Sequence, residues 1–580
     1  MRMTTRARSF IAALLGLGLC TAGLAAAPMY DIVIKGGQIY DGTGSPAYIG
    51  DVGIRGDRIA YIGKPRTSSA TRTIDAHGLA VAPGFINMLS QEQESLFVDG
   101  RSESDLYQGV TLEVMGEGDS MGPLTDAMAA RNTAHEEDVK YPIDWRTLGQ
   151  YLEGRERSGV SLNLASFVGA ATVRDFVLGE GDVEPTEQQL HQMRGLVHQA
   201  MEEGALGVSS ALIYAPAIFA KTDELAALAT EAGDCGGIYI THMRSEADKL
   251  LEAVDETISI ARQSGAPAEI YHLKAAGKSN WSKLDPVIAK VEAARASGVR
   301  ITANMYTYTA GGTGLDATMP AWVREGGLEA WIQRMKDPAI RARLAREMDD
   351  PQAGYENLYL KAGADGMILA QFKNDTLKPL IGKTLTEVAR TRHESPQETI
   401  MDLVIEDGSR VGVIFFVMSE DNVRKETALP WMSFGSDAEA PTPEGVFLKS
   451  NSHPRAYGNF AKLLAQYVRT DHAVTLTDAI HRLTGLPAAN LSLQQRGLLK
   501  SGYFADVVVF DPATIQDHST YVKPHQLATG VRDVLVNGHL ALADGNATGS
   551  TSGRFVRGRA WSGKKGGGCR STAKQWQWTW

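Results

Sequence analysis

The chain has 580 residues, of which 43% are hydrophobic and 22% are charged, and its formal net charge is −10. This composition excludes a collagen, a coiled coil and a wholly disordered chain, and the length allows a large buried core. The acidic balance excludes a basic nucleic-acid surface over the whole chain, and three cysteines are too few for a disulfide framework.

The first 27 residues have the composition of an export signal. Arginines precede an apolar run over residues 10–20, which is short for a membrane span, and three alanines follow at 25–27. We therefore predict a signal peptide over residues 1–27 and a periplasmic or secreted mature protein with no membrane span. A retained membrane anchor is the alternative.

Cleavage after residue 27 would leave two cysteines, Cys235 and Cys569. The two could pair. However, Cys235 lies in a stretch that runs from a predicted helix into a predicted strand, and this position favours a buried thiol.

Both ends of the mature chain are rich in short predicted strands. Residues 28–80 and 497–558 alternate apolar and polar positions between Gly and Asp turns. Two such ends around one long middle suggest that they fold together.

The middle of the chain alternates strands with amphipathic helices, such as the one predicted at 187–204, where apolar residues recur at helical spacing. Eight strands are predicted: residues 80–89, 110–115, 161–168, 204–212, 237–241, 268–271, 299–305 and 432–435. This alternation indicates an α/β fold with a parallel sheet, and eight strands suggest a closed barrel. The barrel would occupy residues 81–310 and 431–496.

Residues 311–430 interrupt that barrel. They contain helices at 328–348 and 385–390 and a strand at 411–417, which predicts an inserted subdomain that could act as a lid. At the other end of the chain, residues 559–580 form a basic, Trp-containing tail that is predicted to be disordered, with binding to an envelope surface as the alternative.

Four side chains follow predicted strands in a pattern that suggests metal chemistry. Glu117, His242 and His272 follow the second, fifth and sixth strands, and Asp437 follows the eighth. The carboxyl ends of barrel strands meet at one mouth, and two imidazoles with a carboxylate are ligands typical of a catalytic zinc. Such an ion lowers the pKa of the water it binds, and Asp437 could move protons as acid and base. A buried polar cluster without metal is the alternative.

Two further clusters carry weaker signals. His191 and His198 are seven residues apart on a polar helix face, where we expect them to be solvated. Arg455 follows the eighth strand, and it could bind a substrate carboxylate with two hydrogen bonds or form a salt bridge at the rim.

Several segments together resemble one known family. They are APGFIN (82–87), QGVT (108–111), MEEGALGVSS (201–210), THMRSE (241–246), IYHLK (270–274), YTYTAG (306–311), GSD (435–437), HPRAYG (453–458) and ADVVVFDP (505–512). The chain resembles the amidohydrolase superfamily, specifically the D-aminoacylase (N-acyl-D-amino-acid deacylase) family, from about residue 30 to about residue 557.

The resemblance implies a metal-dependent (β/α)8 TIM-like barrel, a β-sandwich built from both chain ends, an inserted subdomain and hydrolysis of an N-acyl amide. It matches His242 and His272 to metal ligands and Asp437 to the catalytic acid and base. It also implies candidates for binding the substrate's carboxylate and carbonyl: Tyr214, Lys274, Tyr306 and Arg455.

The chain departs from that family at two places. Leu89 and Gln91 stand where the family has a His-x-His pair, which argues against a second metal site of the usual kind. The family's strand-two cysteine is also absent, and Glu117 is the nearest ligand. Its rivals are Glu113 and Asp119, while Glu92 and Glu94 are explained equally well by a solvated loop.

We therefore expect one divalent metal ion, zinc first, with manganese or iron made plausible by a carboxylate in place of a thiolate. The expected reaction is hydrolysis of the amide bond of N-acyl amino acids, including D-amino acids, or of small peptides. A cyclic amide hydrolase and a metal-free binding protein are the alternatives. The expected partner is a small-molecule substrate, and the sequence leaves both a monomer and a homo-oligomer open.

Overall fold

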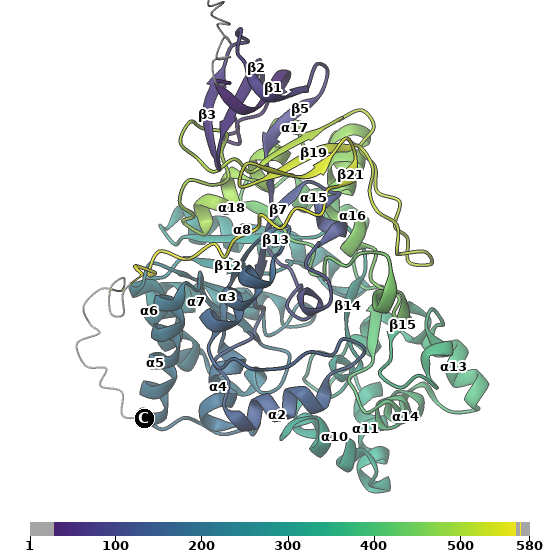
Figure 1. Ribbon diagram of the computed structural model, residues 1–580. Coiled ribbons are helices and arrows are strands. Elements are labelled where there is room, and N and C mark those ends of the chain that lie inside the picture. Colours follow the sequence, from purple (N-terminus) through teal and green to yellow (C-terminus); the bar gives the residue numbers. More distant parts are fainter. Residues whose placement is uncertain (1–27, 564–568, 570–580) are drawn as a thin grey trace, which may run out of the picture.

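The computed structural model describes residues 28–563 and Cys569, and these residues have a mixed α/β fold with four sheets. The predicted signal peptide, residues 1–27, lies outside the described residues. In Figure 1 one sheet lies at the top, the parallel strands and their helices lie below it, and the helices of residues 311–430 lie to one side.

The sheet at the top has nine strands and takes them from both ends of the chain. Its order is β21-β20-β19-β18-β5-β1-β2-β3, with β4 paired to β1, and β5 and β18 are the antiparallel neighbours that join the two ends. The strands are β1 (Tyr30–Ile39), β2 (Tyr48–Arg55), β3 (Arg58–Gly63), β4 (Ala70–Asp75), β5 (Ala80–Pro83), β18 (Val507–Phe510), β19 (Val531–Val536), β20 (His539–Ala543) and β21 (Asn546–Ala547).

The predicted strands of the middle form two parallel sheets. One has the order β6-β7-β8 and the other β17-β13-β12-β11-β10-β9. Their bounds are β6 (Phe85–Asn87), β7 (Val110–Met115), β8 (Asn163–Ser166), β9 (Val168–Gly169), β10 (Gly207–Ala211), β11 (Ile238–His242), β12 (Ala268–Ile270), β13 (Ile301–Met305) and β17 (Met432–Phe434). Backbone hydrogen bonds link the two sheets, from Met88 N to Phe434 O at 3.1 Å and from Leu206 N to Ser166 O at 3.0 Å.

The single strand predicted at residues 80–89 was wrong. It divides at Gly84 into β5, which belongs to the nine-stranded sheet, and β6, which belongs to a parallel sheet. A Cβ atom on residue 84 would collide with the side chain of Thr111, so glycine is required where the chain crosses between the sheets.

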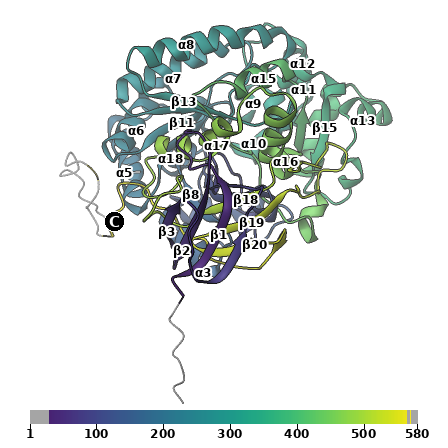
Figure 2. The ribbon, with the colours of Figure 1, turned by 90° about the horizontal axis from the view of Figure 1, so that it is seen from above.

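Helices lie side by side along the parallel strands, as Figure 2 shows for α5 to α8. They are α4 (Ala170–Leu178), α5 (Glu187–Glu203), α6 (Thr222–Asp234), α7 (Leu250–Ser264) and α8 (Leu284–Ala296). The predicted helix at 187–204 is confirmed: the Thr186 and Gln189 side chains cap the first turn of α5, and Gly204 ends it in the left-handed region, with φ 114°.

Residues 311–430 build a sheet and a hydrophobic core of their own. The sheet is β14 (Gly311–Gly314), β16 (Gly412–Phe415) and β15 (Met367–Gln371), and its core includes Trp331 and Leu369. The helices are α9 (Ala321–Arg324), α10 (Gly327–Met335), α11 (Pro338–Asp349), α12 (Leu358–Ala362), α13 (Leu385–Arg392) and α14 (Pro396–Asp407). The one helix predicted at 328–348 is two, because Pro338 begins a new helix with Asp337 as its cap.

The remaining helices pack around these sheets. They are α1 (Glu103–Leu106), α2 (Asp126–His135), α3 (Leu148–Ser158), α15 (Glu420–Thr427), α16 (Arg455–Lys462), α17 (Leu476–Leu483) and α18 (Gly485–Asn490). None of the helices in the described part of the chain is long and apolar enough to cross a membrane.

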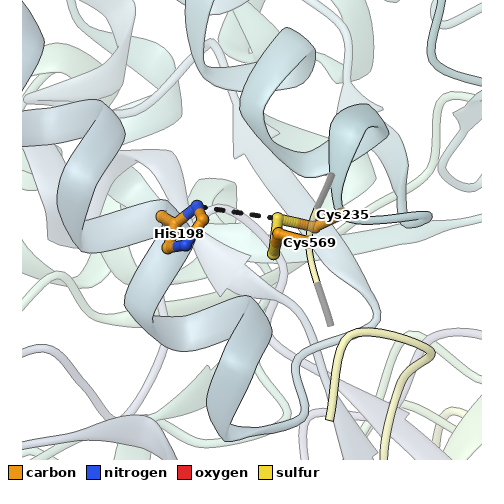
Figure 3. Close-up of side chains that lie close together, drawn as sticks. All are labelled: His198, Cys235 and Cys569. Atoms are coloured by element: carbon orange, nitrogen blue, oxygen red, sulfur yellow. Dashed lines mark hydrogen bonds between the residues drawn. A yellow bond between two sulfur atoms is a disulfide. The ribbon is translucent and has the colours of Figure 1, made fainter. Parts of the chain in front are cut away.

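The favoured interpretation of Cys235 as a buried thiol was wrong. Cys235, directly after α6, forms a disulfide with Cys569, 334 positions away (Figure 3). The predicted disordered tail, residues 559–580, is therefore tethered to the body at Cys569, while residues 564–568 and 570–580 lie outside the described residues. His198 was expected to be solvated but is buried beside this disulfide, with Nδ1 2.8 Å from Glu231 Oε1.

Candidate metal centre

Glu117, His242 and His272 come together at the ends of three parallel strands. Glu117 Oε1 lies 3.2 Å from His242 Nδ1 and 2.8 Å from His272 Nε2. One ligand atom from each residue lies within 4.8 Å of the others. The predicted convergence of these three residues is therefore present in the structure.

Glu117 stands in a tight turn between two glycines that follows β7. Gly116 and Gly118 both have positive φ, 92° and 69°. A Cβ on Gly116 would lie 2.5 Å from Phe167 O, and one on Gly118 would lie 2.5 Å from the Cβ of Ala211. The sequence Gly-Glu-Gly thus lets the backbone pass close to the neighbouring strands while the carboxylate reaches the histidines.

The histidines are placed by the neighbouring strands. His242 is the last residue of β11, and His272 follows β12 with a positive φ of 32°. The His272 backbone N–H donates to Asn304 Oδ1 of β13 at 2.8 Å, and this hydrogen bond holds a conformation that a non-glycine residue rarely adopts.

The cluster is strongly polarised. Burial raises the pKa of Glu117, but the positive charge of His272 and hydrogen bonds from both histidines outweigh it and hold that pKa well below its ordinary value. Burial and Lys274 lower the pKa of His272, but Glu246 and Glu117 outweigh them and raise it to about 9. Glu117 and His272 therefore stabilise each other's charged form.

Glu246 is a site residue that the sequence analysis missed. Its Oε1 lies 2.9 Å from His272 Nδ1 and 2.6 Å from Lys274 Nζ, and its Oε2 lies 3.8 Å from His242 Nε2. A carboxylate behind a ligating histidine fixes the orientation of its ring. The available signal was the position of Glu246, four residues after His242 in the segment THMRSE.

The inserted residues reach the backbone segment that carries Glu246. Glu356 accepts hydrogen bonds from the Ser245 hydroxyl at 2.6 Å and from the Glu246 backbone N–H at 3.0 Å. The loop before α12 therefore contacts the backbone that carries the second layer of the site.

Asp437 faces the cluster from the segment after β17. It also has a positive φ, 51°, and its backbone N–H donates to Leu89 O at 2.8 Å. Its Oδ2 lies 2.8 Å from Arg455 Nη1, and Gln91 Nε2 lies 3.4 Å from its Oδ1 and 2.7 Å from Glu117 Oε2. Gln91 thus links Asp437 to Glu117.

A cavity of about 640 Å³ opens onto this site. One part of it is lined by Glu117, Asp437 and two of the predicted substrate-binding residues, Tyr214 and Arg455. Another part is lined by the inserted residues 312–314, 316 and 410–414. The other two predicted residues, Lys274 and Tyr306, lie next to His272 but do not line this cavity. Lys274 contacts Glu246, and the buried Tyr306 hydroxyl has no hydrogen-bond partner among the described residues.

The rival carboxylates take other positions. Glu113 is fully buried and is not part of the histidine cluster, nor is Asp119. The solvated-loop interpretation of Glu92 was wrong, because Glu92 is 1% exposed and accepts hydrogen bonds from Ser95 and the backbone of Ala440. Glu94 is exposed, as expected.

The donor set fits a divalent metal ion. It offers two imidazoles and one carboxylate, which is the composition of a catalytic site with a position left for water or substrate. His242 Nε2 is buried and has no hydrogen-bond partner among the described residues. A second group, His198 with Cys235 and Cys569, is also compact, but its two sulfur atoms are bonded to each other and are not free thiolates.

Comparisons with known proteins agree on one family. Residues 72–541 match the model of the amidohydrolase family. The chain is 31% identical to the D-aminoacylase of Alcaligenes xylosoxydans xylosoxydans over 529 residues, which are 91% of this chain and 97% of that protein. A solved D-aminoacylase structure, described as having a binuclear metal centre, is 30% identical with a TM-score of 0.76, covering 91% of this chain and all of the other. The N-acyl-D-glutamate deacylase of Bordetella bronchiseptica, solved with zinc and a phosphonate inhibitor, is 28% identical with a TM-score of 0.74, covering 91% of this chain and 99% of the other.

Proposed function

Because this chain belongs to the amidohydrolase family, we propose that it is a metal-dependent deacylase that hydrolyses the amide bond of N-acyl-D-amino acids. The observation that carries the proposal is the cluster of Glu117, His242 and His272, beside which Asp437 lines the same cavity of about 640 Å³ as Glu117. The chain's similarity to deacylases over nine tenths of its length supports the same reaction.

Glu117, His242 and His272 would hold the metal ion, which supplies Lewis acidity towards the amide carbonyl and lowers the pKa of a bound water. We propose zinc, with manganese and iron as rivals, and one ion per chain. Glu246 keeps the His272 ring in place through its contact with Nδ1.

Asp437 is the proposed acid and base. Its carboxylate takes the proton of the attacking water and delivers it to the amide nitrogen as the C–N bond breaks. Arg455 holds one oxygen of Asp437 at 2.8 Å, so the other oxygen, Oδ1, is the one available for the proton.

The substrate's own carboxylate is proposed to bind to Arg455 and Tyr214, which line the cavity. Arg455 is 4% exposed, and its Nε has no hydrogen-bond partner among the described residues. A buried guanidinium with free N–H groups is suited to a carboxylate. Lys274 and Tyr306 remain predicted substrate contacts that would require a shift of the cavity wall.

The experiment is a matched pair of substrates. The purified protein, loaded with zinc, is assayed for release of free amine from N-acetyl-D-leucine and N-acetyl-L-leucine. We expect turnover of the D form to exceed that of the L form, loss of turnover after chelation and recovery after zinc is restored. Equal rates for both forms would contradict the D preference, and no turnover of either would contradict the function.

We also propose that the two parallel sheets close into one (β/α)8 barrel. The hydrogen bonds that join β6 to the residues of β17, and the end of β8 to the residue before β10, support closure. The nine-stranded sheet would then correspond to the β-sandwich at 28–80 and 497–558, and residues 311–430 to the inserted subdomain and lid.

Export is proposed as well. The signal peptide expected at residues 1–27 and the Cys235–Cys569 disulfide both support an oxidising compartment such as the periplasm. Fractionation of cells that express the full chain checks this, and N-terminal sequencing of the exported protein is expected to begin near residue 28. Recovery of an uncleaved protein in the cytoplasm would contradict it.

A further inference from the structure

Gln91 lies between the two segments that carry the site's carboxylates. Its backbone N–H donates to Ala438 O at 3.0 Å, and the N–H of Ser90 donates to Val114 O of β7 at 2.8 Å. Ala438 follows Asp437, and β7 leads to Glu117. Residue 91 is therefore held between the two segments that carry these carboxylates.

The Gln91 amide fills that space. Its Nε2 lies 2.7 Å from Glu117 Oε2 and 3.4 Å from Asp437 Oδ1. Both neighbours only accept hydrogen bonds when ionised, so the NH₂ end of the amide must face them. The other oxygen of each carboxylate is occupied elsewhere, Glu117 Oε1 by the two histidines and Asp437 Oδ2 by Arg455.

The NH₂ group of the amide takes the place that a cation or a proton would otherwise occupy between the two carboxylates. Two carboxylates that face one another favour a shared proton or a bound cation. A side-chain amide supplies two N–H donors, takes up no proton and offers no ligand atom on that side. It thus occupies the position between the two carboxylates and donates to both.

We propose that Gln91 is a positioning residue that restricts the site to one metal ion: its amide holds Glu117 and Asp437 together and fills the place of a second cation. Glu117 then presents only Oε1 to the first ion, and Asp437 stays directed at the substrate. This inference rests on the proposed function. The number of metal ions per chain can nevertheless be measured without a substrate.

The first test counts metal ions. Wild type, Gln91→Glu and Gln93→Glu are dialysed against excess zinc, then against metal-free buffer, and zinc per chain is measured by elemental analysis. Gln93 also lines the cavity, so its variant adds the same charge without placing it between the two carboxylates. We expect one equivalent in wild type and in Gln93→Glu and two in Gln91→Glu. Two equivalents in wild type, or one in Gln91→Glu, would overturn the inference.

The second test removes the hydrogen-bond donor of residue 91 and keeps a side chain of similar size. Methionine is similar to glutamine in length and cannot donate, so a packing role would survive in Gln91→Met. We expect this variant to keep one zinc and the wild-type KM within twofold, while kcat falls about tenfold because a hydrogen bond to a charged group is lost. An unchanged kcat, or loss of the first zinc, would overturn the positioning role.

The two proposals can fail separately. If no N-acyl amino acid is hydrolysed but the zinc counts follow the expected pattern, the substrate assignment fails and the role of Gln91 in metal number stands. If substrates are hydrolysed and wild type holds two ions, the reverse is true.

Discussion

Each oxygen of Asp437 has a different neighbour, and this division gives the residue its chemical role. Oδ2 pairs with Arg455, whereas Oδ1 faces Gln91 and the cavity. The backbone holds a positive φ of 51° there, a cost of about 1–3 kcal/mol that the surrounding hydrogen bonds must offset. Such a conformation is typical of residues whose direction matters for function.

Asp437→Asn is expected to lower kcat by at least about a hundredfold, because an amide cannot carry a proton from water to the leaving nitrogen. Asp437 is not one of the three clustered ligands, so zinc per chain should stay within a fifth of wild type. Steady-state assay and elemental analysis of the same preparation measure both quantities. Turnover equal to that of wild type would exclude the proton-transfer role.

His242→Ala and His272→Ala, unlike Asp437→Asn, are expected to lose zinc as well as turnover. Each removes one of three ligands, so zinc should fall well below half an equivalent after dialysis, and turnover should fall with it. His191→Ala, on the exposed face of α5, is the matched control and should keep its zinc. Full zinc retention in both site variants would refute the metal centre.

At the scale of elements, strand β7 carries a carboxyl group, that of Glu113, which lies outside the metal site. Glu113 is fully buried, and neither of its oxygens has a hydrogen-bond partner among the described residues. Burial, reinforced by Glu92 and Asp105, raises its pKa well above the usual range. Burial likewise raises the pKa of Glu92 to about 7 and that of Asp105 to about 8. The three carboxyl groups form a cluster between β6, β7 and α1.

This cluster predicts a pH dependence of stability. A carboxyl group whose pKa is raised in the folded state binds its proton more tightly there than in the unfolded chain. Its stabilising contribution is therefore complete below about pH 4 and is lost as the pH rises through 7 to 8. We expect the free energy of unfolding in urea to be lower at pH 8.5 than at pH 5.5.

Glu113→Gln should make that difference smaller, because it removes a carboxyl group whose pKa is raised well above its usual range in the folded protein. The exposed Glu153→Gln is the control and should leave the difference unchanged. An identical pH dependence in wild type and Glu113→Gln would show that Glu113 is ionised in the folded protein.

The sequence predicted the elements where the pattern is local. The strand at Val110–Met115 and the helix at 187–204 have the predicted bounds within a residue, because their apolar spacing and caps lie inside the element. The breaks at Gly84 and Pro338 were missed, since both lie within runs whose hydrophobic pattern continues unchanged. The α/β fold class followed from the alternation of strands and helices, and the family followed from motifs that span the chain; the comparisons confirm the family.

The candidate site was also predictable only in part. The convergence of Glu117, His242 and His272 follows from their positions at strand ends, although their role as ligands stays a prediction. Glu246 and Gln91 were not assigned roles, because each acts through a contact with a residue of another strand. Only the tertiary structure shows such contacts.

At the scale of the whole molecule, the disulfide joins the C-terminal segment to α6 across 334 positions. The cysteine count left this pairing open, and the local pattern around Cys235 favoured a free thiol instead. Cross-links that close long loops stabilise mainly by restricting the unfolded chain, and Cys569→Ser is expected to lower the free energy of unfolding by about 2–4 kcal/mol. Urea titration measures this, and reduction of wild type should produce the same change.

The zinc content of Cys569→Ser should match wild type, because the disulfide is not part of the site. Cys235→Ser and the double variant should each lose no more stability than Cys569→Ser does. A double variant that is markedly less stable than either single variant would show that the two cysteines act independently.

The nine-stranded sheet has a consequence for how the protein is made. β5 pairs with β18, so the edge of the N-terminal strands stays open until residues 507–510 have been synthesised. An open strand edge is a template for aggregation. Almost the whole polypeptide must therefore be synthesised before this sheet can be completed, and a chain that ends before residue 507 would keep that edge open and be prone to aggregation.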